Sequence, residues 1–210
     1  MKIPYITFMK HAEKVTKSVP PGRPILKGVH HTGCGDLITT DAHRLYLAKS
    51  VAPSGEPIVL DPKTGDLIDG EYPSVDRLIP NANDANAEIV FNTEELLLGM
   101  NALLKCNLVA KNEKAYVKLN VTQGSVPTIS VKNSYIFSQF TGGYYQGDED
   151  VNLVFDTRFF VDALNLFKAC KIDEIILRYY GSLRPFTITP ETSLDLLALI
   201  SPLRTEGPSE

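Results

Sequence analysis

The chain has 210 residues, of which 43% are hydrophobic and 22% are charged, a composition typical of a folded protein of one or two domains. Its net charge of −4 argues against binding nucleic acid over the whole surface, because such proteins are usually basic. No apolar run approaches the roughly 18 residues of a membrane span, and the first residues do not resemble a signal peptide. We therefore expect a cytoplasmic protein with no membrane partner.

The three cysteines, Cys34, Cys106 and Cys170, are odd in number and widely spaced. No CxxC pair occurs, so the sequence indicates neither a zinc site nor a disulfide framework. A reducing compartment is the simpler interpretation. We expect no metal and no cofactor.

The first 85 residues predict one weak structural unit and a connector. Tyr5–Phe8 is an apolar run, and His11–Val19 fits a helix that stops at Pro20-Pro21-Gly22. Three strand candidates follow: Ile25–His31, Leu37–Thr40 and Arg44–Ala48. Residues 51–85 are rich in proline and glycine, which predicts a connector with at most one short strand, near Ile58–Leu60.

The rest of the chain contains an internal repeat. Val90-Phe91-Asn92-Thr93 recurs 64 positions later as Val154-Phe155-Asp156-Thr157, and the same offset keeps the apolar positions of two helical segments in phase. A fixed offset of this kind indicates structural duplication. In each copy an apolar strand leads to a capping residue, Asn92 or Asp156, then to a helix (residues 93–106 or 157–171) and to three strand-like runs. The predicted unit is therefore β-α-β-β-β.

Three segments carry a resemblance to a known family. RPILKG followed by LITTDAHRLYLA (Leu37–Ala48) resembles the middle domain of the bacterial DNA polymerase III beta subunit, the sliding clamp. GEYPSVDRLIP (Gly70–Pro80) is similar to the segment between its middle and last domains, and LALISPLRT (Leu197–Thr205) is similar to its C-terminus. The resemblance implies an α+β clamp fold of β-α-β-β-β units, with helices on one face and antiparallel sheets on the other.

The resemblance also implies domain boundaries and a shortened form. We expect a truncated middle-type domain over residues 1–85, a complete C-terminal-type domain over 86–205, and a tail over 206–210. Helices 93–106 and 157–171 should lie side by side, with two four-stranded sheets behind them. The incomplete first domain should leave one sheet edge unpaired, protected by the connector or by a partner chain. Its oligomeric state is open, and a monomer or weak oligomer is expected.

In the family, a pocket between the middle and last domains receives short linear peptides of the Gln-x-x-Leu-Phe kind from polymerases and loaders. The resemblance carries this pocket onto the following positions: Leu26, Thr40, Ala42, His43, Arg44, Leu45, Pro73, Arg77, Leu78, Leu199, Ile200, Ser201, Pro202, Leu203 and Arg204. Two of them depart from the family pattern. Ala42 stands where the family has glycine, and Ser201 stands where the family often has methionine. Without the resemblance, these would be ordinary strand and turn residues.

A DNA-facing surface is a further hypothesis. Lys10, Lys14 and Lys17 share one face of the first predicted helix, and Arg158, Lys168 and Lys171 could extend the stripe. In clamps, basic helices meet double-stranded DNA phosphates without reading sequence. The alternative is a solvated helix face.

An enzyme is not expected. Asp41 and His43 could share a strand face, whereas His30 and His31 should point to opposite faces. No nucleophile motif, metal-binding motif or phosphate-binding loop accompanies them. The leading hypothesis is a sliding-clamp-like replication scaffold that binds partner peptides and DNA. The alternatives are a clamp mimic that acts as an adaptor or decoy without encircling DNA, and a relative with an unrelated partner.

Overall fold

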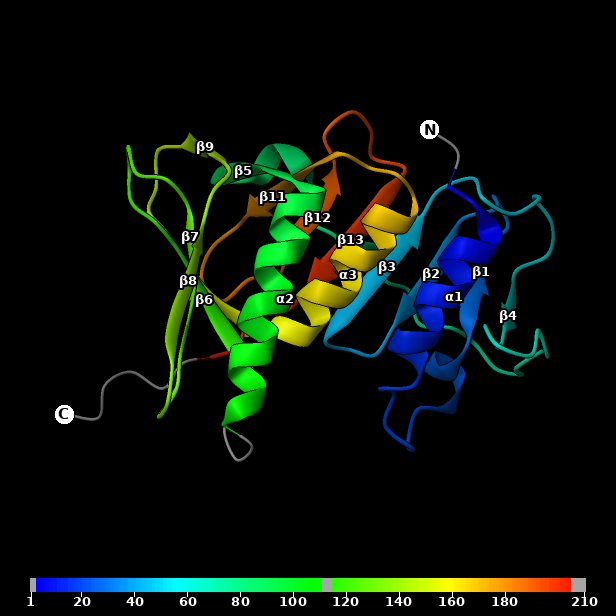
Figure 1. Cartoon of the computed structure of the whole chain (residues 1–210). Coiled ribbons are helices and arrows are strands. Elements are labelled where there is room, and N and C mark those ends of the chain that lie inside the picture. The colour runs from blue at the N-terminus through cyan, green and yellow to red at the C-terminus, as the bar shows by residue number, and fades with distance from the viewer. Residues whose placement is uncertain (1–2, 111–114, 205–210) are drawn as a thin grey trace.

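The computed structural model describes residues 3–110 and 115–204, and its three long helices lie side by side with strands behind them (Figure 1). The helices are α1 (Tyr5–Thr16), α2 (Thr93–Val109) and α3 (Thr157–Ala169), with short 3-10 turns η1 (Pro24–Lys27), η2 (Asp76–Leu78) and η3 (Ala82–Asp84). The strands are β1 (Val29–His31), β2 (Leu37–Thr40), β3 (Arg44–Ala48), β4 (Ile58–Leu60), β5 (Ala87–Asn92), β6 (Tyr116–Val121), β7 (Thr128–Lys132), β8 (Phe137–Thr141), β9 (Tyr144–Gly147), β10 (Val151–Asp156), β11 (Glu174–Tyr179), β12 (Phe186–Pro190) and β13 (Leu196–Ile200). None of these helices is long and apolar enough to cross a membrane, within the residues described.

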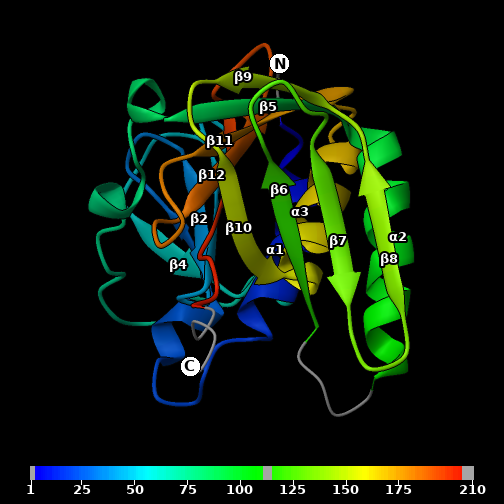
Figure 2. The same ribbon diagram turned by 90° about the vertical axis from the view of Figure 1, so that its left-hand side faces the viewer.

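The duplicated part of the chain exchanges strands between its two copies. β5 opens the first copy but pairs with β11 of the second, while β10 opens the second copy and pairs with β6 of the first. Each copy therefore completes the other's sheet, as a pseudo-twofold duplication requires. Helices α2 and α3 pack against each other, as predicted. Figure 2 shows the resulting four-stranded sheet, β10-β6-β7-β8, beside α2.

The second sheet is larger than the four strands expected. Its order is β4-β1-β2-β3-β13-β12-β11-β5-β9, because β3 of the first unit pairs with β13 of the last and joins both parts into one sheet. Strand β9 was missed in the sequence. It is only four residues long, follows Gly142-Gly143, and pairs with β5 at the sheet edge.

The helix ends follow from local chemistry. The side chain of Asn92 accepts hydrogen bonds from the backbone N–H groups of Glu94 and Glu95, and Asp156 caps α3 in the same way at Arg158. At the other end of α3, Ile172 N–H donates to Phe167 and Lys171 N–H to Lys168, a Schellman arrangement that requires a left-handed residue. Lys171 supplies it with φ of 57°.

Two predictions for the first unit were wrong. The helix begins at Tyr5, not at His11, because Phe8, Met9, Ala12 and Val15 occupy one buried helical stripe. The segment Ile25–His31 is not one strand, since its first part forms the 3-10 turn η1 and only Val29–His31 pairs with a neighbour. A continuous apolar run of this length fits either structure.

The connector protects the sheet edge, as predicted. Its one strand, β4, pairs with β1, and Leu67 bridges back to Leu60. The connector then crosses the face of the nine-stranded sheet that is turned away from the helices, which we call the outer face. There Ile68, Tyr72, Val75 and Ile79 cover a second apolar cluster, separate from the main core beneath the helices.

Candidate functional site

Pairing of β3 with β13 brings two of the predicted peptide segments together. Leu45 lies opposite Leu199, Arg44 lies opposite Ile200, and the N–H of Ser201 donates to the carbonyl of His43 at 2.9 Å. Because successive strand residues point to opposite faces, Leu45 and Leu199 reach the outer face while Ile200 enters the main core.

The outer face gathers residues from all three predicted peptide segments. Leu26, Leu45 and Leu199 are at most 4% exposed and share the second apolar cluster with Val75. Each fully buried side chain of this kind contributes about 1.5–3 kcal/mol. Leu78 follows Val75 by one turn and is 56% exposed, and Leu203 is 37% exposed. Three of the selected leucines are thus buried in one cluster, and two others are exposed.

A tight turn places His43 at the end of β3. The carboxylate of Asp41 accepts from the N–H groups of His43 and Arg44, both at 3.0 Å. The hydroxyl of Thr40 donates to the carbonyl of Arg44 at 2.7 Å. Ala42 has φ of 75°, a left-handed conformation that favours glycine. This explains why glycine suits the position that Ala42 occupies.

His43 is exposed and stacks on Phe159 of α3, with ring centroids 6.2 Å apart. Sequence reasoning missed Phe159, although it follows Arg158, which was selected for its charge. One signal could have identified Phe159: it lies in the first helical turn of the predicted helix 157–171, the end expected to face residues 41–43. Pro73, Arg77 and Arg204 are exposed, and Pro202 is half-buried.

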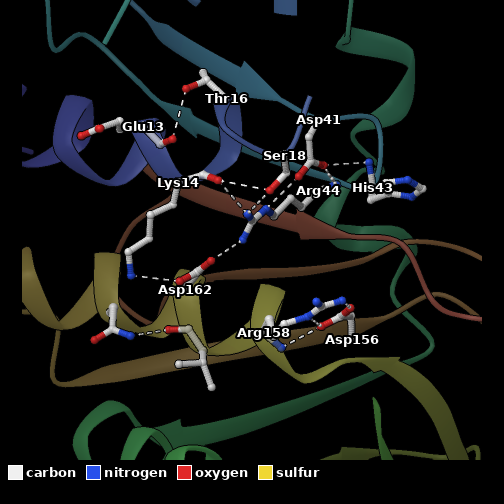
Figure 3. Close-up of polar contacts among 12 residues, drawn as sticks. Glu13, Lys14, Thr16, Ser18, Asp41, His43, Arg44, Asp156, Arg158 and Asp162 are labelled. Atoms are coloured by element: carbon white, nitrogen blue, oxygen red, sulfur yellow. Dashed lines mark hydrogen bonds and ion pairs between the residues drawn. The ribbon is translucent and has the colours of Figure 1, made fainter. Parts of the chain in front are cut away.

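Arg44 is an internal cross-link between the first unit and α3 (Figure 3). Its side chain is 2% exposed. Its Nε donates to Asp41 at 3.1 Å, Nη1 to Asp162 at 2.8 Å and Nη2 to the carbonyl of Lys14 at 3.1 Å. The guanidinium also lies 4.6 Å from the ring centre of Phe159. These bonds direct Arg44 toward the helices, so its contribution to the outer face is to hold the turn in place.

Most of the predicted DNA-facing cations form ion pairs with carboxylates of the helix layer, defined as α1, α2 and α3 with their caps. The pairs are Lys14–Asp162 at 2.9 Å, Lys17–Glu13 at 2.7 Å, Lys168–Glu94 at 2.7 Å and Arg158–Asp156 at 2.5 Å. Hydrogen bonds from Lys17 and Lys168 lower the pKa of Glu13 and Glu94. Lys10 and Lys171 are exposed and make no ion pair with the residues described.

The adjacent histidines His30 and His31 make separate contacts. His31 Nδ1 lies 3.1 Å from the carbonyl of Val29 and Nε2 lies 3.0 Å from the hydroxyl of Tyr5, whereas His30 stacks on Tyr72 at the outer face. The two therefore point to opposite faces, as predicted. The carboxylate of Asp41 is occupied by the turn and by Arg44. No group of three or more metal-ligating side chains occurs over residues 3–110 and 115–204.

Known proteins resemble the chain in both sequence and fold. The beta sliding clamp of Lactococcus lactis subsp. lactis is 32% identical over 142 residues, a match that covers 66% of this chain and 36% of that protein. The beta sliding clamp of Bacillus subtilis is 27% identical over 176 residues, covering 81% of this chain and 41% of that protein.

The chain belongs to the beta sliding clamp family. It spans about 36–41% of the length of these two relatives. No protein-family model matches it. Membership of this family agrees with a binding protein that does not catalyse a reaction.

Solved sliding clamps share the fold over nearly the whole chain. The sliding clamp of Bacillus subtilis superposes with a TM-score of 0.78 at 24% identity, covering 97% of this chain and 64% of that chain. The polymerase III subunit beta of Pseudomonas aeruginosa gives a TM-score of 0.76 at 13% identity and covers 95% of this chain. At these identities the likeness concerns the fold, and it includes the α+β arrangement of helices over antiparallel sheets.

Proposed function

We propose that the chain is a sliding-clamp-like scaffold whose outer face binds the clamp-binding peptides of polymerase or loader proteins. One observation carries this proposal. Residues distant in sequence, Leu26, Leu45 and Leu199, share one apolar cluster with Val75 of the connector. In the family these positions belong to the peptide pocket, so the residues that the resemblance selected converge in space.

The geometry supports binding through an apolar anchor. A leucine or phenylalanine of the peptide can bury its side chain against the exposed Leu78 and Leu203, while backbone groups near the turn at His43 meet its polar ends. Each 100 Å² of apolar surface removed from water contributes about 2.5 kcal/mol. Ser201 offers less apolar surface than methionine would. We therefore expect a modest Kd, on the order of 10⁻⁵ M.

Fluorescence polarisation of a labelled Gln-x-x-Leu-Phe peptide tests the proposal. The wild-type chain should bind saturably, and Leu78→Glu should weaken binding at least about tenfold, because a carboxylate would meet an apolar anchor. Leu98→Glu is the matched control. Leu98 is 65% exposed on α2, close to the 56% of Leu78, and its substitution should leave affinity unchanged. Equal loss in both variants, or no saturable wild-type binding, would contradict the proposed site.

A second candidate function is a clamp mimic, an adaptor or decoy that binds partner peptides without encircling DNA. The ion pairs of Lys14, Lys17, Arg158 and Lys168 favour it, since paired cations attract phosphates less. Within their bounds, the three helices carry five Lys or Arg and four Asp or Glu residues. Retention on non-specific double-stranded DNA at low salt separates the two functions. The decoy predicts none, and the DNA scaffold predicts retention that falls steeply with salt.

A further inference from the structure

A hollow lies at the β4 end of the outer face, and its lining includes none of the residues assigned to the peptide site. Its volume is about 420 Å³, within the range of ligand-binding pockets. Its walls come from β1, β4 and the connector, and the apolar ones are Pro57, Ile58, Val59, Leu67 and Ile68. Two of these large apolar side chains are strongly exposed for a hydrophobic residue, Ile58 at 39% and Leu67 at 62%.

Carboxylates surround this apolar hollow. Asp69 and Glu71 line it on either side of Gly70, whose φ of 134° bends the chain there. Glu56 and Asp66 directly precede the lining residues Pro57 and Leu67. All four carboxylates belong to exposed residues and make no ion pair with the described part of the chain. Residues 56–71 contain five carboxylates and one lysine, so this end of the molecule attracts cations.

The hollow also contains an unsatisfied hydrogen-bonding group. His30 lines it and stacks face to face on Tyr72, with ring centroids 5.0 Å apart. Its Nδ1 is buried and has no hydrogen-bond partner among residues 3–110 and 115–204. Buried polar atoms are rarely left unpaired in proteins. Once the ring turned to present Nδ1 to the hollow, a ligand that donates a hydrogen bond would satisfy this nitrogen in a neutral imidazole.

We propose that this hollow is a docking site for a basic segment of a partner protein, which inserts an arginine side chain. Arginine fits on three counts. Its aliphatic stem can cover the apolar walls, its guanidinium carries only donors, which suit carboxylates and an accepting imidazole nitrogen, and it is less strongly hydrated than lysine. Its lining includes none of the residues assigned to the peptide site, although Val59, Ile68 and Tyr72 belong to the same second apolar cluster. The proposal does not depend on peptide binding.

The test uses the 210-residue chain and a fluorescent hexapeptide of alternating arginine and leucine. At about 50 mM salt, where exposed charges are only partly screened, wild type should bind this peptide and not its glutamate–leucine counterpart. The double variant Asp69→Asn/Glu71→Gln should bind about fivefold more weakly, as expected for two ion pairs at the rim. The control Glu95→Gln/Asp148→Asn makes the same change in net charge elsewhere and should cost less than about twofold.

The histidine ring resonances locate the bound peptide. Binding should shift the ring signals of His30 and leave those of His43, which belongs to the proposed peptide site, unchanged. Equal loss of affinity in the two double variants would reduce the effect to overall charge and overturn the proposal, as would shifts at His43 without shifts at His30. Binding of the Gln-x-x-Leu-Phe peptide should be unaffected by Asp69→Asn/Glu71→Gln, so the two sites succeed or fail independently.

Discussion

The outer face of the large sheet and the helix layer were both predicted from sequence to be binding surfaces. In the structure, the selected side chains of the two surfaces have different surroundings. On the outer face, Leu26, Leu45 and Leu199 share one buried cluster, while the selected Leu78 and Leu203 are exposed. On the helix layer, most selected cations are engaged by carboxylates. The comparison teaches that the burial of apolar side chains can be anticipated from the sequence, whereas the charge that a basic side chain presents to solvent depends on the carboxylates that the fold brings beside it.

The largest expected effect concerns Arg44, which joins the two regions. Removing its side chain in Arg44→Ala leaves the fully buried carboxylate of Asp41 without its cation, which should cost about 3–5 kcal/mol of unfolding free energy. Urea denaturation measures this loss. Arg158→Ala is the control, because its ion pair is on a side chain 61% exposed and should cost under about 1 kcal/mol. Similar costs for both would show that Arg44 is not a structural cross-link.

The pH dependence of stability should separate the buried His31 and the half-buried His11 and His30 from the carboxylates. Burial lowers the pKa of His11, His30 and His31, so the folded state keeps them neutral while the unfolded state takes up protons below about pH 6.5. The contribution of these histidines to the free energy of unfolding is therefore fully present at pH 7.5, and it falls as the pH drops through 6.5 toward the folded pKa values. The lowered pKa values of Glu13 and Glu94 act in the same direction, but in a more acidic range.

Urea midpoints at pH 7.5 and 5.5 measure this effect. His31→Gln should reduce the difference between the two midpoints. A stability that is constant or rises toward pH 5.5 would contradict the assignment of neutral, buried imidazoles.

Much of the fold could be predicted because the signals are local. Asn92 and Asp156 cap helices where expected, and the 64-residue repeat places α2 and α3 side by side. The start of α1 could not be predicted from Tyr5–Phe8, because four apolar residues in a row suit a strand or a buried helix. No local sequence pattern predicts that β3 pairs with β13 and so joins the two parts of the chain in one sheet.

The candidate site divides in the same way. The resemblance selected Leu45 and Leu199 together, and strand alternation places both in the second apolar cluster. The role of Arg44 could not be predicted, because its partner Asp162 lies 118 positions away. The same is true of Lys168 on α3, which donates a hydrogen bond to Glu94 on α2. Ion pairs between distant segments leave no periodic signal in the sequence.

A smaller effect is expected at the turn of the outer face. Ala42→Gly relieves a left-handed backbone that costs a non-glycine residue about 1–2 kcal/mol, partly offset by the greater freedom of glycine in the unfolded chain. The net gain should be about 0.5 kcal/mol by urea denaturation. Ala102→Gly, at an exposed position of α2, should instead lose about 1 kcal/mol. Destabilisation by both would contradict the strained turn.

The smallest expected effect tests the neutralised helix layer. Glu94→Gln removes the partner of Lys168 and should increase retention on double-stranded DNA at low salt by less than about threefold, with a salt slope steeper by at most about 0.9. Glu191→Gln makes the same charge change away from the helices and is the control. An equal gain from both variants would mean that only net charge matters.

The measurement that tests the central claim most directly is a map of amide chemical shifts during two titrations, one with the Gln-x-x-Leu-Phe peptide and one with duplex DNA. The account predicts that the peptide shifts amides within residues 40–45, 73–78 and 199–204 and leaves α1, α2 and α3 unchanged, while DNA at physiological salt shifts neither region. Peptide-induced shifts centred on the helix layer, or strong DNA-induced shifts there at that salt, would contradict it.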